Sequence, residues 1–269
     1  MRQIGLAAIV AVITLGCSAD RETAIVPQDF DADYTAYSRV LTSFVRGETV
    51  DYASLKQNSS DLNTFIGELA GLSSEQFQKM SRDEQMALWI NAYNGITLRS
   101  IIDNYPVVSI KDIKGVWGGN KWSVAGRDVT LDQIEHKILR PEFKEPRIHF
   151  AVNCAAVGCP PLLVEPFVAS KLEQQLDLVS RNFINNTHRN RINPHNNMVT
   201  STEIFSWFGG DFLSHYGTDE FPHLERVPAA VMNFVFEHVD STILDMLDRS
   251  GEWTLDYLPY DWSLNDIAR

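Results

Sequence analysis

One helix-forming segment, residues 81–103, constrains the fold of this chain more than any other. Ser81 and Glu84 have the spacing of an N-terminal capping box, and a proline at position 106 ends helical structure soon afterwards. Apolar side chains recur around most of the helix circumference, at Met86, Trp89, Ile90, Tyr93, Ile96 and Ile101. A helix that is apolar on nearly all sides is buried, so the segment predicts a central helix around which the domain packs.

The same helix contains two asparagines, Asn91 and Asn94, about one turn apart. Buried amide groups need hydrogen-bond partners. We therefore expect a polar network in the interior, in which the two side chains either hold a neighbouring loop or contact a substrate.

Other helix signals are spread along the chain. Capping-box patterns begin at Thr130 and Ser170, and periodic apolar residues follow both. The predicted helices cover 130–140 (ending before Pro141), a segment starting at 170, 202–208, and 227–249 with a break near Asp240.

Strand signals are fewer and short. They predict a hairpin within 117–130, a strand over 148–154, a pair of strands flanking 193–197 and a last strand over 253–257. The fold class is therefore α+β, a single helix-rich domain with a small mixed or antiparallel sheet.

The N-terminus has the pattern of a bacterial lipoprotein signal. Arg2 precedes an apolar run that is shorter than the roughly 20 residues a membrane-spanning helix needs, and the run ends at Gly16–Cys17. We expect a signal peptide over 1–16, a lipid anchor on Cys17, a flexible tether over 17–35 and one globular domain over 36–269. The membrane is then a partner of the chain through its anchor.

Ser18 directly after the anchoring cysteine predicts the periplasm-facing outer membrane within the bacterial cell envelope. The alternative is an ordinary secretory signal in which Cys17 is incidental.

Composition and charge exclude two classes of protein. An apolar content of 44% is too high for a disordered chain, and a net charge of −12 argues against nucleic acid as a partner. If Cys17 is lipidated, only Cys154 and Cys159 remain of the three cysteines. An even pair in an oxidising compartment is typical of a disulfide.

Glu135 and His136 are the first candidates for chemistry. Glu135 falls within the apolar face of the 130–140 helix, which is formed by Leu131, Ile134, Ile138 and Leu139, and His136 lies on its flank. A carboxylate on a buried face must be paired or hydrogen-bonded. Either Glu135 holds a neighbouring loop, or it orients an imidazole or acts itself as acid or base.

The segment 148–154 contains His149, Asn153 and Cys154. In an extended strand His149 and Cys154 would lie about 16 Å apart and point to opposite faces, at ~3.3 Å per residue. His149 is then too far away to activate Cys154, and His136 is the better candidate base.

A metal site built from His136, His149, Cys154 and Cys159 is a further hypothesis. The Cys-x4-Cys spacing is wider than a zinc knuckle and a second cysteine pair is missing. We therefore assign no metal ligand and no cofactor. Asp261, between two aromatic residues, either supports a site or caps the last turn. The aromatic residues around it and in 204–212 are expected to pack in the core.

Six motifs together resemble the domain of unknown function 547 family, in its bacterial secreted and lipoprotein form. They run from about 80 to 265: Trp89–Asn94, Val116–Gly119, Leu131–His136 with Leu139-Arg140, His149–Cys154 with Cys159-Pro160, Ile204–Trp207 with Asp211-Phe212, and Tyr260–Asn265. The resemblance implies that Glu135, His136, His149, Cys154 and Cys159 belong to the family signature. It implies no established activity.

Three functions remain open for a cell-envelope lipoprotein of this kind. The first is a thiol-dependent hydrolase or acyltransferase, with Cys154 as nucleophile, His136 as base and Glu135 orienting it. Asn91, Asn94 and Asn153 would then donate to substrate. The second is a binding protein without catalysis, whose Cys154–Cys159 disulfide shapes a pocket lined by His149. The third is the His/Cys metal site.

Overall fold

A computed structural model describes residues 25–269. The predicted signal peptide over 1–16, the predicted lipid anchor on Cys17 and the start of the predicted tether lie outside the described residues. The rest of the predicted tether is docked on the domain. The Gln28 N–H donates to the Gly67 carbonyl on α3 (Ser60–Gly71), at 2.9 Å, and Tyr34 is buried. A Cβ on Gly71 would lie 1.8 Å from the Gln28 carbonyl oxygen, so only glycine allows this approach. The described part of the predicted tether thus contacts the domain at Gln28 and Tyr34, and its flexibility stays a prediction.

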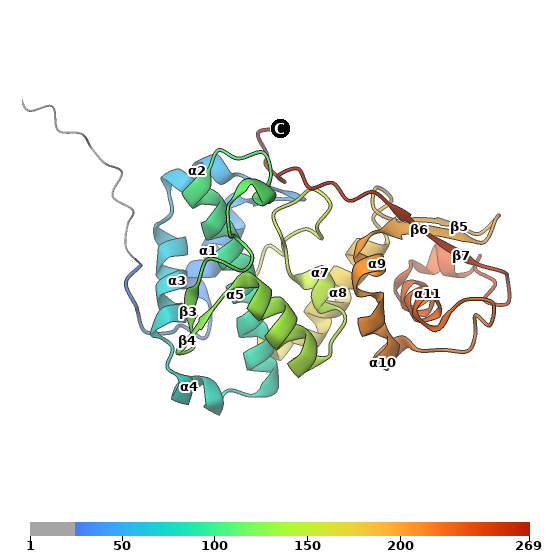
Figure 1. The fold of residues 1–269 in the computed structure, drawn as a ribbon, viewed down its shortest axis with the longest axis horizontal. Coiled ribbons are helices and arrows are strands. Elements are labelled where there is room, and N and C mark those ends of the chain that lie inside the picture. Colours follow the sequence, from blue (N-terminus) through green and yellow to red (C-terminus); the bar gives the residue numbers. More distant parts are fainter. Residues whose placement is uncertain (1–24) are drawn as a thin grey trace, which may run out of the picture.

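The N-terminal half of the domain is a cluster of helices around α5 (Arg82–Asn104) (Figure 1). The sequence patterns did not separate the elements that precede α5. They are α1 (Thr35–Phe44), β1 (Val45–Arg46), β2 (Thr49–Val50), α2 (Tyr52–Gln57), α3 and α4 (Ser74–Lys79). Together they cover α5, and the prediction of a central helix is confirmed because every residue from Met86 to Ile102 is buried. The capping box is also confirmed: the Glu84 N–H donates to Ser81 Oγ, and the Ser81 N–H donates to the Glu84 carboxylate.

After α5 come a 3-10 turn, η1 (Ile110–Asp112), and the predicted hairpin, β3 (Trp122–Val124) with β4 (Arg127–Val129). The turn residues Ala125 and Gly126 both have positive φ, which matches the twist of a tight hairpin. The Thr130 capping box opens α6 (Leu131–Gln133) as predicted.

The expected end of this helix before Pro141 is wrong. The chain continues as a π-helix, η2 (Ile134–Phe143), with Pro141 inside it. A proline in an α-helix clashes with the carbonyl four residues earlier. In the wider π-helical turn each N–H pairs five residues back, so the chain passes through Pro141 without ending.

The predicted strand over 148–154 is also wrong. Residues Ile148–Ala151 form a short helix, α7, and the chain becomes extended only from Val152. His149 and Phe150 donate their N–H groups to the carbonyls of Pro146 and Arg147, at 3.2 and 3.0 Å. All four residues of α7 are buried, and the rings of Phe150 and Phe183 lie 4.8 Å apart. A short apolar run that is buried on all sides has no periodicity that separates a strand from a helical turn.

α8 (Leu172–Ile184) buries the predicted apolar positions, but Ser170 does not cap it. A 3-10 turn, η3 (Ala169–Lys171), leads into the helix instead, and the Gln175 side chain accepts the Val168 N–H at 2.9 Å.

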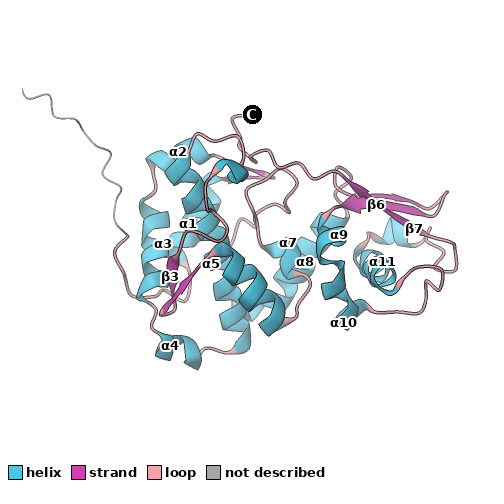
Figure 2. Cartoon of the chain, in the orientation of Figure 1, coloured by secondary structure: helices cyan, strands magenta, loops and turns pink. Residues whose placement is uncertain are grey.

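The C-terminal part contains the three-stranded sheet, seen to the right in Figure 1 and in magenta in Figure 2. β5 (Arg191–Asn193) pairs antiparallel with β6 (Met198–Thr202), which pairs in parallel with β7 (Thr254–Leu258). The helices of this part are α9 (Ile204–Phe208), η4 (Gly209–Phe212), α10 (Leu213–Tyr216), α11 (Arg226–His238) and α12 (Ser241–Leu244). Asp240 is the N-cap of α12, which confirms the predicted break. The predicted class, a helix-rich α+β fold with small sheets, is confirmed.

After β7 the chain crosses back to the N-terminal helices (Figure 1). The Leu264 N–H donates to the Val108 carbonyl at 2.8 Å, and the Val50 N–H donates to the Asn265 carbonyl at 2.9 Å. This return positions residues 257–263 across the middle of the molecule. Within residues 25–269 we find no helix with the length and apolarity needed to cross a membrane.

Candidate functional site

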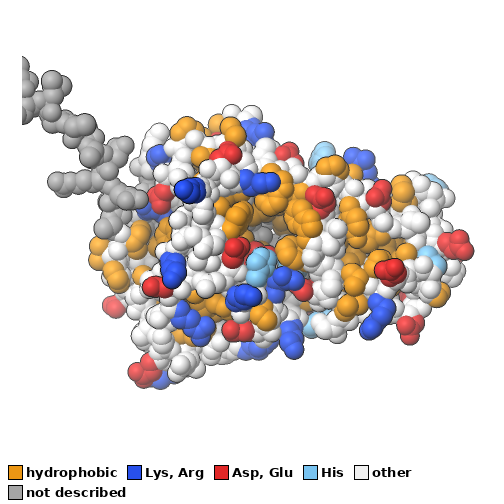
Figure 3. Space-filling view, viewed as in Figure 1, with side chains coloured by type: hydrophobic (Ala, Val, Ile, Leu, Met, Phe, Trp, Pro, Cys, Tyr) orange, Lys and Arg blue, Asp and Glu red, His pale blue; other side chains and the backbone are white. Residues whose placement is uncertain are grey.

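A cavity of about 290 Å³ lies where six separate parts of the chain meet. Hydrophobic side chains surround a hollow near the middle of the face in Figure 3, with acidic, basic and histidine side chains beside it. The cavity is lined by Tyr93, Trp117, Asp132, Glu135, His136, His149, Val152, Cys154, Cys159, Pro160, Ile204, Trp207, Phe208, Tyr260 and Trp262. Most of the candidate residues from the sequence are therefore brought together here.

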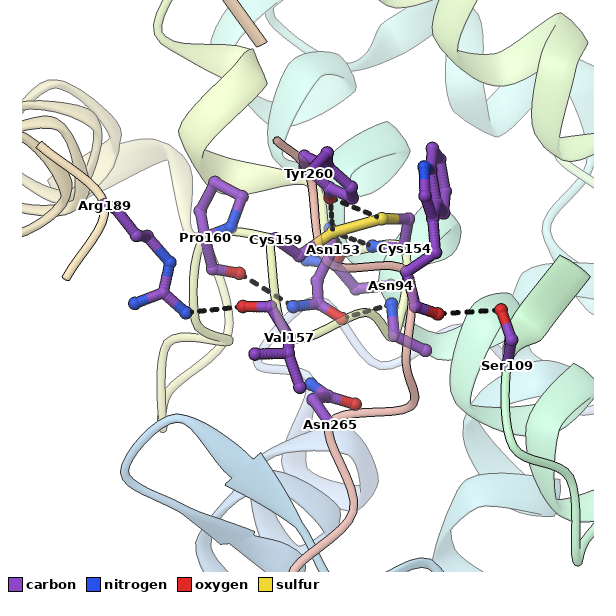
Figure 4. The surroundings of a disulfide bond; sticks show 12 residues. Asn94, Ser109, Asn153, Cys154, Val157, Cys159, Pro160, Arg189, Tyr260 and Asn265 are labelled. Carbon is purple, nitrogen blue, oxygen red and sulfur yellow. Dashed lines mark hydrogen bonds between the residues drawn. A yellow bond between two sulfur atoms is a disulfide. The ribbon is translucent and has the colours of Figure 1, made fainter. Parts of the chain in front are cut away.

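Cys154 and Cys159 form a disulfide in the cavity wall, with their Cα atoms 6.2 Å apart. Cys154 is half-buried, whereas Cys159 is only 4% exposed. The Tyr260 hydroxyl points toward the disulfide in Figure 4 and lies 3.1 Å from each sulfur atom. The Cys154 N–H donates to Cys159 Sγ at 2.8 Å. The second hypothesis, a binding protein without catalysis, required this pairing of Cys154 with Cys159. In this state Cys154 has no free thiol with which to act as a nucleophile.

His149 is one member of a charged network that reaches the cavity. It donates from Nε2 to Asp211, at 2.9 Å, and its ring stacks on Phe208 with the centroids 4.2 Å apart. Arg140 donates two hydrogen bonds to the same carboxylate, at 2.6 and 3.0 Å. Burial alone would raise the pKa of Asp211, but the hydrogen bonds from His149 and Arg140 outweigh it and hold that pKa well below its usual range. Asp211 is therefore ionised at neutral pH.

The residues of this network illustrate what sequence reasoning missed. The expectation that His149 and Cys154 point away from each other came from the assumed strand. Because α7 is helical, both side chains line the same cavity. Arg140 and Asp211 each belong to one of the six motifs that resemble the family. Their ion pair could not be predicted from the sequence, because the two residues are 71 positions apart.

Glu135 and His136 both line the cavity, although they are not bonded to each other. Their nearest atoms, Glu135 Oε1 and His136 Nδ1, lie 3.8 Å apart, which is too long for a hydrogen bond. His136 Nδ1 instead faces Arg140 Nη1 at 3.3 Å. The Glu135 side chain is 13% exposed and lies against Tyr93. Burial, and then the Glu135 charge, raise the pKa of Tyr93 well above its usual value, so its hydroxyl remains protonated.

The side chains of Asn91, Asn94 and Asn153 form hydrogen bonds with backbone groups of neighbouring segments. Asn91 bonds to both the N–H and the carbonyl of Phe167, at 2.9 and 2.8 Å. Asn94 accepts the Asn153 N–H and donates to the Ala151 carbonyl, at 2.8 and 2.9 Å. Asn153 in turn accepts the Ala155 N–H and donates to the Pro160 carbonyl, both of which follow Cys154 in the chain; Figure 4 shows the bond to Pro160. Asn94 and Asn153 thus fix the segment that carries the disulfide, and Asn91 fixes the backbone at Phe167. This agrees with the prediction that the asparagines hold neighbouring loops.

Asp261 lies next to the site and outside the cavity lining. Its carboxylate accepts the Ser263 N–H at 2.9 Å, and hydrogen bonds from Ser263 lower the pKa of Asp261. Its carbonyl accepts the Gly158 N–H at 2.9 Å, which ties the disulfide loop to the segment that carries Tyr260.

The aromatic residues were expected to pack in the core, and several of them instead form the cavity wall. Tyr260 lies between Trp207 and Trp262, with ring centroids 5.0 and 4.7 Å away. Trp207 is 43% exposed and stands at the mouth. A wall of this kind is typical of small-molecule sites, which combine aromatic surfaces with a few polar groups.

The metal hypothesis finds no support in the part of the chain that the structure describes. There, no group of three or more His, Cys, Asp or Glu side chains is placed to hold a metal ion. The sulfur atoms of both cysteines are used in the disulfide.

The segment that carries α5, the hairpin, η2 and the disulfide can be compared with known proteins. Residues 77–184 match the model of a protein family of unknown function, DUF547. This match is shorter than the predicted region of about 80 to 265, and it leaves Trp207, Asp211 and Tyr260 outside. Neither a curated protein nor a solved structure matches the chain. The DUF547 match therefore supports the resemblance without supplying an activity.

Proposed function

We propose that this chain is a binding protein of the bacterial cell envelope, and that its cavity takes a small organic molecule with a positively charged end. The observation that carries the proposal is the composition of the cavity wall. Two carboxylates, Asp132 and Glu135, face an aromatic surface, and the lining within the described residues contains no lysine or arginine.

The charges beside the cavity do not cancel the carboxylates. The guanidinium group of Arg140 is held by Asp211 in a two-point ion pair. Arg189, whose charge acts on Tyr260, is paired with Glu48 at 2.8 Å. A buried carboxylate such as Glu135 gains most from a ligand that brings an opposite charge. A cation is therefore favoured over a neutral or anionic ligand.

The aromatic rings favour the same class of ligand. A cation is attracted to the face of an aromatic ring within about 6 Å of its centre. Lys111 and Arg140 already occupy one face of Trp262 and one face of Phe208, at 4.8 and 4.9 Å. Trp207, which is 43% exposed, remains for a bound cation.

The location follows from the N-terminal pattern and is part of the proposal. A lipid on Cys17 would hold the domain at the periplasmic face of the outer membrane. A disulfide is stable in that oxidising compartment, which agrees with the pairing of Cys154 and Cys159.

A thiol-dependent hydrolase or acyltransferase is a second candidate, and one observation favours it. Cys154 shares the cavity with His149, whose Nε2 is oriented by Asp211. In covalent catalysis a third group commonly orients the general base, and Asp211 would do this for His149. The activity would require reduction of the disulfide, and His149 would replace His136 as the base.

Titration with choline, followed by tryptophan fluorescence, tests the proposal. We expect saturable binding, and we expect Glu135→Gln to weaken it about tenfold, since it removes a charge worth about 1–2 kcal/mol beside the ligand. Glu75→Gln is the matched control, because Glu75 is exposed and pairs with Lys79 away from the cavity. Equal affinity in both variants, or the absence of choline binding, would contradict the proposal.

A further inference from the structure

We propose that the Cys154–Cys159 disulfide is redox-active, and that it exchanges reversibly with a small external thiol that enters the cavity and attacks Cys154. This activity is independent of the proposed binding of a cation, because it rests on the sulfur atoms and their surroundings.

The first observation is the difference in exposure of the two sulfur-bearing residues. Both cysteines line the cavity of about 290 Å³, but Cys154 is half-buried whereas Cys159 is only 4% exposed. Thiol–disulfide exchange depends on access to the sulfur that is attacked. An external thiol therefore reaches Cys154 first, and Cys159 becomes the leaving group.

The second observation is that the leaving sulfur has donors already in place. The Cys154 N–H donates to Cys159 Sγ at 2.8 Å, and the Tyr260 hydroxyl donates to it at 3.1 Å. Burial raises the pKa of Tyr260 well above its usual range, so its hydroxyl keeps the proton. Hydrogen bonds of this kind stabilise a thiolate, and a more stable thiolate leaves faster.

The third observation is the size of the loop that the disulfide closes. The two cysteines are five positions apart. A disulfide stabilises a fold mainly by closing long loops, so this one contributes less than a bridge between distant segments. The loop is held independently, because Asn153 donates to the Pro160 carbonyl at 2.7 Å and the Gly158 N–H donates to Asp261. The protein can therefore open the bond and remain folded.

The reaction balances as a two-electron exchange. The thiolate of a small thiol forms a bond to Cys154 Sγ, the bond between the two protein sulfurs breaks, and Cys159 leaves as a thiolate. A second molecule of the same thiol attacks the external sulfur of the mixed disulfide and releases Cys154. The small thiol is oxidised to its disulfide, and the protein is reduced to the dithiol. The reverse sequence oxidises the protein.

Mass spectrometry after incubation of the native protein with reduced glutathione tests the assignment. The chain carries Cys17→Ser, so that Cys154 and Cys159 are its only cysteines. We expect glutathione on Cys154, with Cys159 alkylated by iodoacetamide after the quench. Modification of Cys159 by glutathione would overturn the assignment. A disulfide that resists millimolar glutathione until the protein is unfolded would overturn the activity itself.

Single-cysteine variants give a second measurement in the same background. With Ellman's reagent we expect Cys154 in Cys159→Ser to react at least tenfold faster than Cys159 in Cys154→Ser. Equal rates, or a faster Cys159, would overturn the proposal. Far-UV circular dichroism checks that both variants are folded.

The hydroxyl of Tyr260 provides the matched test of the leaving group. We expect Tyr260→Phe to slow exchange with glutathione several-fold. Tyr105→Phe is the control, because the Tyr105 hydroxyl donates to Asp266, outside the cavity, at 2.7 Å. Identical rates in the two variants would show that Tyr260 does not assist. Choline binding is measured separately, so a failure of the redox proposal and a failure of the binding proposal are distinguishable.

Discussion

His149 Nε2 lies 2.9 Å from Asp211 Oδ2, although the two residues are 62 positions apart in the sequence. The contact joins the short helix α7 to the turn η4, and Arg140 joins η2 to the same carboxylate. These contacts hold α7, η2 and η4 together, and two of the three elements, α7 and η2, line the cavity. The cavity keeps its shape because this network and the asparagine network fix the backbone on either side.

Replacement of this carboxylate is expected to destabilise the protein. Asp211→Asn leaves Arg140 without its partner, and removing one partner from a buried pair is costly. The Asp211 side chain is 30% exposed, so solvent screens part of this interaction. We therefore expect the free energy of unfolding at pH 7 to fall by about 2 kcal/mol. Urea unfolding measures it, with the exposed Asp219→Asn as control. A change below about 0.5 kcal/mol would contradict the role of the pair.

The pH dependence of stability follows from the lowered pKa of Asp211. A carboxyl group with a lowered folded pKa stabilises the fold above its unfolded pKa, which is about 4. That contribution is lost as the pH falls below about 4. The wild type should therefore lose more stability between pH 5 and pH 3 than Asp211→Asn does. Parallel curves for the two proteins would refute this assignment.

The Asn94 side chain is expected to be essential for the position of the disulfide segment. Asn94→Ala leaves the Ala151 carbonyl and the Asn153 N–H without partners in the interior. An unsatisfied buried group costs about 1–3 kcal/mol, so we expect a loss of about 2–4 kcal/mol in thermal or urea unfolding. Asn104→Ala, at an exposed position of the same helix, should cost less than about 0.5 kcal/mol. Similar losses of stability in both variants would show that the hydrogen bonds of Asn94 contribute no more to stability than the side chain of an exposed asparagine.

Glu68 predicts a pH dependence of the opposite sign. It is 6% exposed, its Oε2 has no hydrogen-bond partner among the described residues, and burial raises its pKa to about 7. A carboxyl group with a raised folded pKa favours the folded state when protonated, so stability falls as the pH rises from about 4.5 to 7. We expect Glu68→Gln to stabilise the protein at pH 8 and to have less effect at pH 5. The difference in melting temperature between the two pH values measures this, and Glu75→Gln should show none.

The sequence predicted the elements whose signals are local. The Ser81 and Thr130 capping boxes, the turn at Ala125-Gly126 and the break at Asp240 all involve neighbouring residues, and all are observed. The segment 148–154 was predicted wrongly, because a four-residue apolar run has too little periodicity to identify a helical turn.

Several candidate residues from the sequence lie together in the structure, but most of their contacts were not predicted. Cys154, His136, Glu135 and His149 do line one cavity. Tyr260 lines it from the C-terminal part, and Asp211 contacts the lining residue His149. Nothing near Asp211 or Tyr260 in the sequence indicates a partner. Contacts of this kind depend on how the chain returns after β7, which local patterns do not contain.

The measurement that tests the central claim most directly compares choline with 3,3-dimethylbutan-1-ol, in which a neutral carbon replaces the charged nitrogen. The two molecules have nearly the same shape, so calorimetric titration of the wild-type protein isolates the effect of the charge. The acidic, aromatic cavity predicts that choline binds at least tenfold more tightly, which corresponds to about 1.4 kcal/mol. Equal affinity for the two molecules, or tighter binding of the neutral one, would contradict the account.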